Sequence, residues 1–192
     1  MSWRAPSKRR AAMQGGCRGF ERKGREAGPR SGGYGAGMTY RIEGLDPARF
    51  AHLVGLGDSE LAALGVVRMA ADAPTGFPCR VRLDDVAPGE TLLLLNHVSH
   101  DGPNPYRASH AIFIGEQSSD AACFSDEVPP SFDRRIMSLR AFDKEGMMRD
   151  AALAQPGEAD AVIRRLLADA QVDHIDAHNA VRGCFAARID RA

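Results

Sequence analysis

A thiol and an imidazole stand close together near the end of the chain. Five residues, the last of them a glycine, separate His178 from Cys184. This connection suits a β-hairpin, and strands over 172–178 and 184–189 would place His178 opposite Cys184. Asp176 lies two residues before His178, on the same face of that strand. A base beside a thiol, with a carboxylate to orient the base, is the arrangement that a cysteine nucleophile needs.

The same register predicts two further pairs on that face. They are Asp176 opposite Ala186, and His174 opposite Arg188. The competing interpretation is that Cys184 is a small buried residue packed against a ring, because buried free cysteines are usually inert.

Two other pairs of residues are candidates for ligand binding. Cys79 and Arg80 follow the loop 74–78, and a guanidinium beside a thiol can stabilise a thiolate and attract an anion. Alternation along a strand favours another arrangement, with the cysteine inward and the arginine in an outward ion pair. Tyr106 and Arg107 follow a proline-rich loop and would line a pocket, unless the arginine ties its own loop to an acid or a carbonyl.

Histidines and cysteines are scattered along the chain without the spacing of a recognised zinc site. We therefore predict no metal ion and no cofactor. The residues considered as ligands are His97, His100, His110, His174, His178, Cys79 and Cys184. The chain also lacks a glycine-rich phosphate loop, a dinucleotide fingerprint, a Gly-x-Ser-x-Gly elbow and a His-Glu-x-x-His motif.

The composition divides the chain into two parts. Residues 1–37 carry nine Lys or Arg and two Glu, are rich in glycine and lack apolar periodicity, which predicts a disordered basic extension. Because basic runs without interleaved aromatic residues are common in solvated tails, we do not expect a nucleic-acid partner. Translation in the host is expected to start at Met38, and 38–192 to form a single globular domain.

Hydrophobic segments indicate where the protein resides. The chain has no apolar signal-peptide core and no apolar run approaching 18 residues, so we predict a cytoplasmic protein that does not enter a membrane. A disulfide between Cys79 and Cys184 is conceivable, but a reducing cytosol disfavours it.

The pattern of apolar residues predicts an α+β fold. Two short helices begin at Asp46-Pro47 and at Asp58, and an amphipathic helix covers 159–170. Many short strands lie between them, which favours a mainly antiparallel sheet. The expected strands cover 66–69, 81–83, 91–96, 106–114 and 136–142, and 97–105 is expected to be a loop.

Six short strings of residues resemble one bacterial family, the domain of unknown function 1203 family. They are Gly76-Phe77-Pro78-Cys79-Arg80, Pro105-Tyr106-Arg107-Ala108, Ile112-Phe113-Ile114, Leu139-Arg140-Ala141-Phe142-Asp143, and His178-Asn179-Ala180 with Gly183-Cys184-Phe185. The resemblance covers roughly 38–192 and implies no activity or catalytic residue. Phe142 departs from the family pattern, where we expect tyrosine.

We therefore expect a small cytoplasmic domain that binds an unknown small molecule or protein. Its pocket would lie near Cys79, Arg80, Tyr106, Arg107 and the 178–184 hairpin. The alternative is a cysteine-dependent enzyme that acts on an acyl, peptide or thiol-reactive substrate. In that enzyme Cys184 is the nucleophile, His178 the base and Asp176 the residue that orients the base.

Overall fold

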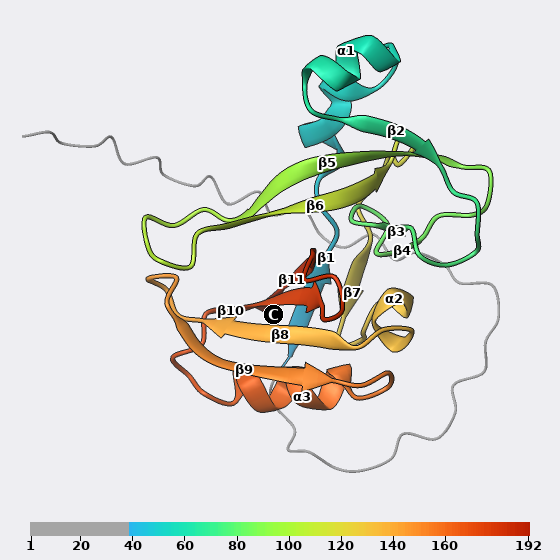
Figure 1. Cartoon of the computed structure of the whole chain (residues 1–192). Coiled ribbons are helices and arrows are strands. Elements are labelled where there is room, and N and C mark those ends of the chain that lie inside the picture. Colours follow the sequence, from blue (N-terminus) through green and yellow to red (C-terminus); the bar gives the residue numbers. More distant parts are fainter. Residues whose placement is uncertain (1–38) are drawn as a thin grey trace, which may run out of the picture.

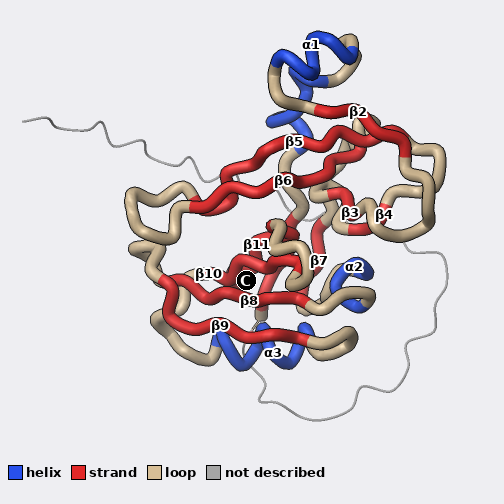
Figure 2. Tube along the Cα trace, viewed as in Figure 1, coloured by secondary structure: helices blue, strands red, loops and turns tan. Residues whose placement is uncertain are grey.

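The computed structural model of the protein describes residues 39–192 (Figure 1). Two β-sheets lie face to face in this part of the chain, and short helices cover their outer sides (Figures 1 and 2). The predicted extension over 1–37 and the predicted start at Met38 lie outside the described residues.

The first sheet, sheet A, has six strands, and all of its neighbouring pairs are antiparallel. Their spatial order is β7 (Cys123–Ser125), β1 (Tyr40–Glu43), β11 (Phe185–Arg191), β10 (His174–Asn179), β8 (Met137–Phe142) and β9 (Met148–Ala154). The strand that carries His174, Asp176 and His178 is therefore central and has a neighbour on each side.

The second sheet, sheet B, has five strands and one parallel pair, β3 with β6. Their order is β2 (Val67–Ala70), β5 (Thr91–His100), β6 (Ala108–Gly115), β3 (Pro78–Cys79) and β4 (Asp84–Asp85). The long strands β5 and β6 form the part of this sheet that lies above β8 and β10 (Figure 1).

The helices are short, and local capping explains where the first ones begin. The 3-10 helix η1 (Pro47–Leu53) starts after Asp46, whose carboxylate accepts a hydrogen bond from the Ala48 N–H at 2.9 Å. Helix α1 (Asp58–Ala63) follows Gly57 and ends before Gly65, which has a left-handed φ of 71°. The other two helices are α2 (Pro130–Asp133) and α3 (Ala159–Leu167).

Alternation along β10 separates an apolar face from a polar one. Ile175 and Ala177 belong to an apolar cluster that also includes Ile163 and Leu167 of α3. The residues between them therefore point to the other face, toward sheet B. Contacts across the sheets agree, because the His178 ring lies 4.9 Å from the ring of His110 on β6.

A layer of polar side chains consequently lies between the two sheets. We call it the inter-sheet layer and define it as His97, His100, His110, Arg140, His174, Asp176 and His178. Most of these side chains are buried, and apolar clusters lie on either side of them. Buried polar groups need partners, so the contacts within this layer indicate its chemistry.

The predicted fold class is confirmed, including the mainly antiparallel strands, the two short N-terminal helices and the late amphipathic helix. Two local predictions are wrong. β5 continues to His100 where a loop was expected from His97, and 81–83 is a turn rather than a strand. In the described part of the chain, no helix is long and apolar enough to cross a bilayer.

Candidate functional site

The hairpin of β10 and β11 forms in a different register from the predicted one. His178 pairs with Phe185 and Ala177 with Ala187, so Ala186 is the extra residue of a β-bulge. Beyond the bulge, the partners of His174 and Asp176 are shifted by two residues relative to the prediction. They are Asp190 for His174 and Arg188 for Asp176, which makes the predicted pairs wrong.

Cys184 lies in the turn just before β11, and its sulfur has two N–H donors. Arg80 Nη2 lies 3.1 Å and Asn179 Nδ2 3.3 Å from the sulfur. The Nδ1 of His178 instead lies 3.3 Å from the backbone oxygen of Asp176. Among residues 39–192, no hydrogen bond joins Cys184 to His178, so the structure places Arg80 and not His178 beside the thiol.

Arg80 is almost completely buried, with 2% of its surface exposed. Its Nε donates to Phe185 O at 2.8 Å, and its Nη1 donates to Pro78 O. Burial lowers the pKa of Arg80, and the neighbouring Cys184 acts in the opposite direction. The outward ion pair expected for Arg80 is wrong, because Cys79 ends β3 and the strand alternation stops there.

Cys79 is a residue of the hydrophobic core. It is buried, and its sulfur accepts a hydrogen bond from the Gly115 N–H at 3.1 Å. Cys79 and Cys184 are both free thiols, so the conceivable bridge between them does not form.

Tyr106 and Arg107 lie in the loop between β5 and β6. Arg107 is mostly exposed and pairs with Asp101 of its own loop at 2.9 Å, while the Tyr106 ring meets the edge of Phe142. In the described part of the chain, no hydrogen bond, ion pair or ring contact links this pair to Arg80. The four predicted ligand-binding residues are therefore not gathered around one point by direct contacts.

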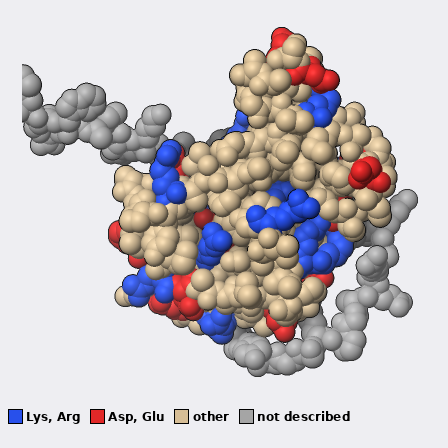
Figure 3. All heavy atoms as spheres, in the orientation of Figure 1, with Lys and Arg blue, Asp and Glu red and all other residues tan. Residues whose placement is uncertain are grey.

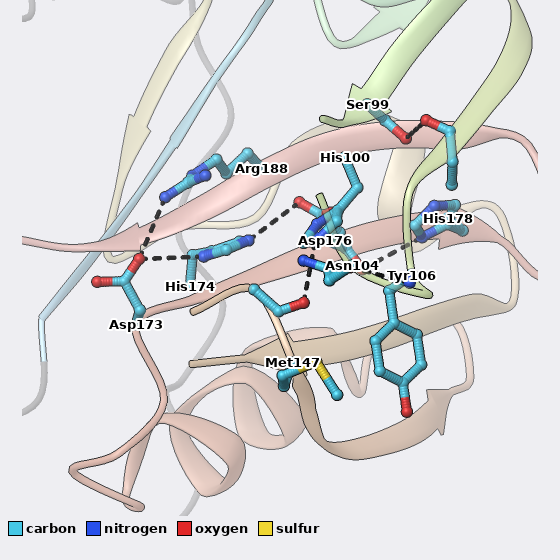
Figure 4. A network of polar contacts seen from close by, with 12 residues as sticks. Ser99, His100, Asn104, Tyr106, Met147, Asp173, His174, Asp176, His178 and Arg188 are labelled. Carbon is cyan, nitrogen blue, oxygen red and sulfur yellow. Dashed lines mark hydrogen bonds and ion pairs between the residues drawn. The ribbon is translucent and has the colours of Figure 1, made fainter. Parts of the chain in front are cut away.

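The structure instead brings together three residues that the sequence analysis did not combine. They are His100 at the end of β5 with His174 and Asp176 on β10, and all three are buried. His100 Nδ1 lies 3.5 Å from one Asp176 oxygen, and His174 Nε2 lies 3.9 Å from the other (Figure 4). One donor atom from each residue lies within 4.8 Å of the others. We call these residues the triad.

Hydrogen bonds on the outer side of each triad histidine determine which nitrogen carries the proton. His174 Nδ1 lies 3.1 Å from the Asp173 carboxylate, and His100 Nε2 lies 3.0 Å from the Gly146 carbonyl oxygen. Both oxygens can only accept, so these nitrogens carry the hydrogens. In the neutral form of each ring, the other nitrogen, which lies on the side of Asp176 (Figure 4), carries the lone pair.

Two lone pairs that face a carboxylate need a cation between them. A proton or a metal ion can occupy that position. Burial lowers the pKa of His174 and raises the pKa of Asp176, so burial disfavours the charged form of each. A metal ion satisfies all three groups at once, because neutral imidazole and carboxylate are its ordinary ligands.

The surroundings hold the triad in place. Phe142 stacks on the His174 ring at 5.4 Å and lies 4.4 Å from the His100 ring. Arg188 Nη2 lies 3.5 Å from Asp173, the carboxylate that orients His174. A hydrogen-bonded carboxylate behind a histidine ligand is the usual outer contact of a metal site.

Comparison with known proteins identifies the family of the chain. The family model described as "Protein of unknown function (DUF1203)" matches residues 76–191. The chain belongs to the DUF1203 family. No curated protein and no solved structure matches this DUF1203 protein. The predicted family is thus confirmed, and the matched region includes His100, His174 and Asp176.

One sequence signal pointed to the triad of this DUF1203 protein. His174 and Asp176 are two residues apart on a strand, so their side chains share a face. The third ligand candidate comes from the other sheet, and His100 was expected in a loop rather than at a strand end. No local pattern relates a position on β5 to one on β10.

Proposed function

We propose that this protein binds one divalent transition-metal ion through His100, His174 and Asp176. The observation that carries the proposal is the position of two imidazole nitrogens that both face one buried carboxylate, while the opposite nitrogen of each ring contacts an outer oxygen. The sequence analysis expected an unknown ligand and no metal ion. We now propose that the ligand binds through a metal ion, and this proposal replaces the prediction of no metal.

The distances suit an ion after a small adjustment. Metal bonds to nitrogen and oxygen of about 2.0–2.2 Å place the donor atoms about 3.0–3.7 Å apart at bond angles of 90–120°. The separation of 3.5 Å lies within that range and that of 3.9 Å just beyond it, each to a different oxygen of Asp176. One donor atom from each residue lies within 4.8 Å of the others, so side-chain movements of about 1 Å would bring the donors of the triad to bonding distance.

Three protein ligands make this a site of the open type. Structural zinc sites use four protein ligands, whereas catalytic sites leave a position for water or substrate. A bound ion there would polarise an oxygen of its ligand or activate water. We therefore propose a metal-dependent activity rather than a purely structural role for the ion.

Titration of EDTA-treated protein with Co²⁺ and Zn²⁺ tests the proposal. We expect one ion per chain, a rise in Tm on binding, and loss of binding in His174→Gln and Asp176→Asn. Asp173→Asn should weaken binding by about 10- to 100-fold, because it removes the carboxylate that orients His174. Asp58→Asn is the matched control, since Asp58 is an exposed aspartate of α1 that pairs with Arg68 of β2 and belongs to neither the triad nor the inter-sheet layer.

Two results would contradict the metal centre. One is the absence of binding to the folded wild-type protein at millimolar metal. The other is equal binding by the wild-type protein and both triad variants, with folding verified by circular dichroism.

A second candidate function is the cysteine-dependent enzyme, in which Arg80 and Asn179 rather than a base would activate the thiol. Arg80 and Asn179 both donate to the Cys184 sulfur, and two N–H donors stabilise a thiolate without a base. Cys184 remains the proposed nucleophile, and the roles of His178 as base and Asp176 as orienting residue remain predictions. A cytoplasmic location also stays a proposal, which fractionation of expressing cells would check.

A further inference from the structure

An arginine without a carboxylate partner lies beside the triad. Arg140 on β8 is the cross-strand neighbour of Asp176, and directly opposed residues have Cβ atoms about 5 Å apart on one face of the sheet. Arg140 is half-buried, and its Nε lies 3.4 Å from Ser138 Oγ. Among the described residues, no carboxylate lies within ion-pair distance of this guanidinium.

The charge of Arg140 reaches two neutral rings of the inter-sheet layer. Burial lowers the pKa of His178 to about 3, and Arg140 is the next largest cause. Burial and then Arg140 also lower the pKa of His110, whose ring lies 4.9 Å from that of His178. The hydrogen bond of Arg140 to Ser138 agrees with this position, because Ser138 is the cross-strand partner of His178, and the guanidinium therefore lies on the His178 side of Asp176.

The other arginine next to Asp176 is already engaged. Arg188 lies opposite Asp176 on β11, but its Nε donates to Asp190 at 2.7 Å and its Nη2 faces Asp173. Basic side chains also gather along the line where the two sheets meet on the face shown in Figure 3. Of the two arginines beside the triad carboxylate, Arg140 is the one that remains available for a ligand.

Charge and coordination together define the ligand. A divalent ion keeps one positive charge after Asp176 has bound it, and Arg140 adds a second charge nearby. The triad leaves at least one coordination position for a group that is not part of the protein. A guanidinium and a metal ion share one preferred partner, an oxygen that carries negative charge.

We propose that the metal centre takes a small oxyanion as its substrate or ligand, with one oxygen on the ion and another held by Arg140. The inference rests on the proposed metal centre. It assigns Arg140 as the residue that selects for negative charge, a role that the triad alone does not provide. The rings of His178 and His110 lie 4.9 Å apart in the same inter-sheet layer, and each can donate or accept a hydrogen bond.

The visible spectrum of the Co²⁺-loaded full-length protein provides the test. We titrate it with acetate, succinate and inorganic phosphate, and expect at least one anion to shift the d–d bands to saturation. Arg140→Gln should raise the Kd of that anion about tenfold or more, because a charged hydrogen bond is lost. Its Co²⁺ affinity should stay within about threefold of wild type, since Arg140 is not a ligand.

Arg107→Gln is the matched control, because Arg107 is an exposed arginine of the neighbouring β5–β6 loop and pairs with Asp101. It should leave the Kd of every anion unchanged. Arg140→Lys keeps the charge without the planar fork and replaces Arg140→Gln if that variant does not fold. A response to acetate or succinate alone assigns a carboxylate, and a response to phosphate alone assigns a phosphate.

Failure of the metal centre and failure of the oxyanion site would give different experimental results. If wild-type protein binds no Co²⁺, the metal centre is wrong and the oxyanion site falls with it. If Co²⁺ binds but no anion changes its spectrum, or if Arg140→Gln and wild type bind the anion equally, the oxyanion site is wrong and the metal centre stands.

Discussion

At the scale of single residues, Cys184 differs from an inert cysteine through the donors that reach its sulfur. A guanidinium and an amide both donate to it, whereas Cys79 is sealed in the core with a backbone N–H. The side chain of Asn179 is therefore the contact to remove, because Arg80 also holds two backbone carbonyls and its loss would disturb the core.

Removal of the amide should slow the reaction of Cys184 with iodoacetamide at pH 7. In Asn179→Leu we expect the rate to fall about three- to tenfold, since one hydrogen bond to the sulfur is lost. His178→Asn is the control and should leave the rate unchanged, because His178 does not contact the thiol. Peptide mass spectrometry locates the label. Labelling only after unfolding, or a large effect of His178→Asn, would contradict the Arg80–Asn179 account.

At the scale of elements, the turn between β8 and β9 positions a metal-ligand candidate. The Gly146 carbonyl oxygen accepts from His100, and Gly146 has a φ of 76°. A Cβ at this position would lie 2.7 Å from Asn104 Nδ2 and 2.9 Å from His100 Nε2. The turn therefore approaches the triad more closely than any residue with a side chain permits.

Gly146→Ala should weaken metal binding although it leaves all three ligands in place. The new methyl group must displace the turn or the His100 ring, which breaks the contact that orients the ring, and we expect a loss of about tenfold in affinity. Gly157→Ala is the control, because Gly157 has a φ of 86° and nothing within 4 Å of the new Cβ. Calorimetric titration with Zn²⁺ compares the two variants.

Both substitutions place alanine in the left-handed region, so both should lower the free energy of unfolding by about 1 kcal/mol. Only Gly146→Ala should also change the metal affinity. Equal affinities in the two variants would show that the turn does not position His100.

Local patterns predicted most of these elements, and long-range contacts explain what they missed. Apolar runs and capping were enough for the strands around 91–96 and 136–142 and for the helices at Asp46 and Asp58. Three of the last four residues of β5 are polar and the strand end precedes a Gly/Pro loop, which resembles an exposed segment. They remain a strand because they pair with β6, and His100 also packs against Phe142 of sheet A, a contact that is not visible in the sequence.

In the candidate site, too, local patterns predicted some features and long-range contacts determined the others. Alternation along β10 correctly predicted that His174, Asp176 and His178 share a face. The bulge that moved Cys184 away from His178 depends on how β11 pairs with β1 as well as with β10. Neither the bulge nor the approach of His100 from the other sheet could be derived from spacing.

At the scale of the whole molecule, the inter-sheet layer makes stability depend on pH. Burial lowers the pKa of His97 to about 4 and that of His178 to about 3, and it also lowers the pKa of His110 and His174. Unfolded histidine titrates near a pKa of about 6.5. These four rings therefore stay neutral in the folded protein at a pH where the unfolded chain already binds protons.

The difference between the folded and unfolded pKa values determines whether stability rises or falls with pH. The stability that the neutral rings contribute is fully present above about pH 6.5 and is lost as the pH falls toward their folded pKa values. Asp176 acts in the opposite direction, because burial raises its pKa and the folded state keeps its proton at a higher pH than the unfolded chain does. Four histidines outweigh one carboxylate, so we expect a net loss of stability from pH 7 to pH 4.5.

Urea denaturation in EDTA between pH 4.5 and 7.5 measures this slope without bound metal. His178→Gln should flatten it by at most about 1.4 kcal/mol per pH unit, since one fewer ring resists protonation. His52→Gln is the control, because His52 is exposed on η1 and outside the inter-sheet layer. Saturating Zn²⁺ should steepen the loss on acidification, as protons compete with the ion for His100 and His174. A slope that neither His178→Gln nor Zn²⁺ changes would mean that the histidines between the sheets are already solvated in the folded protein.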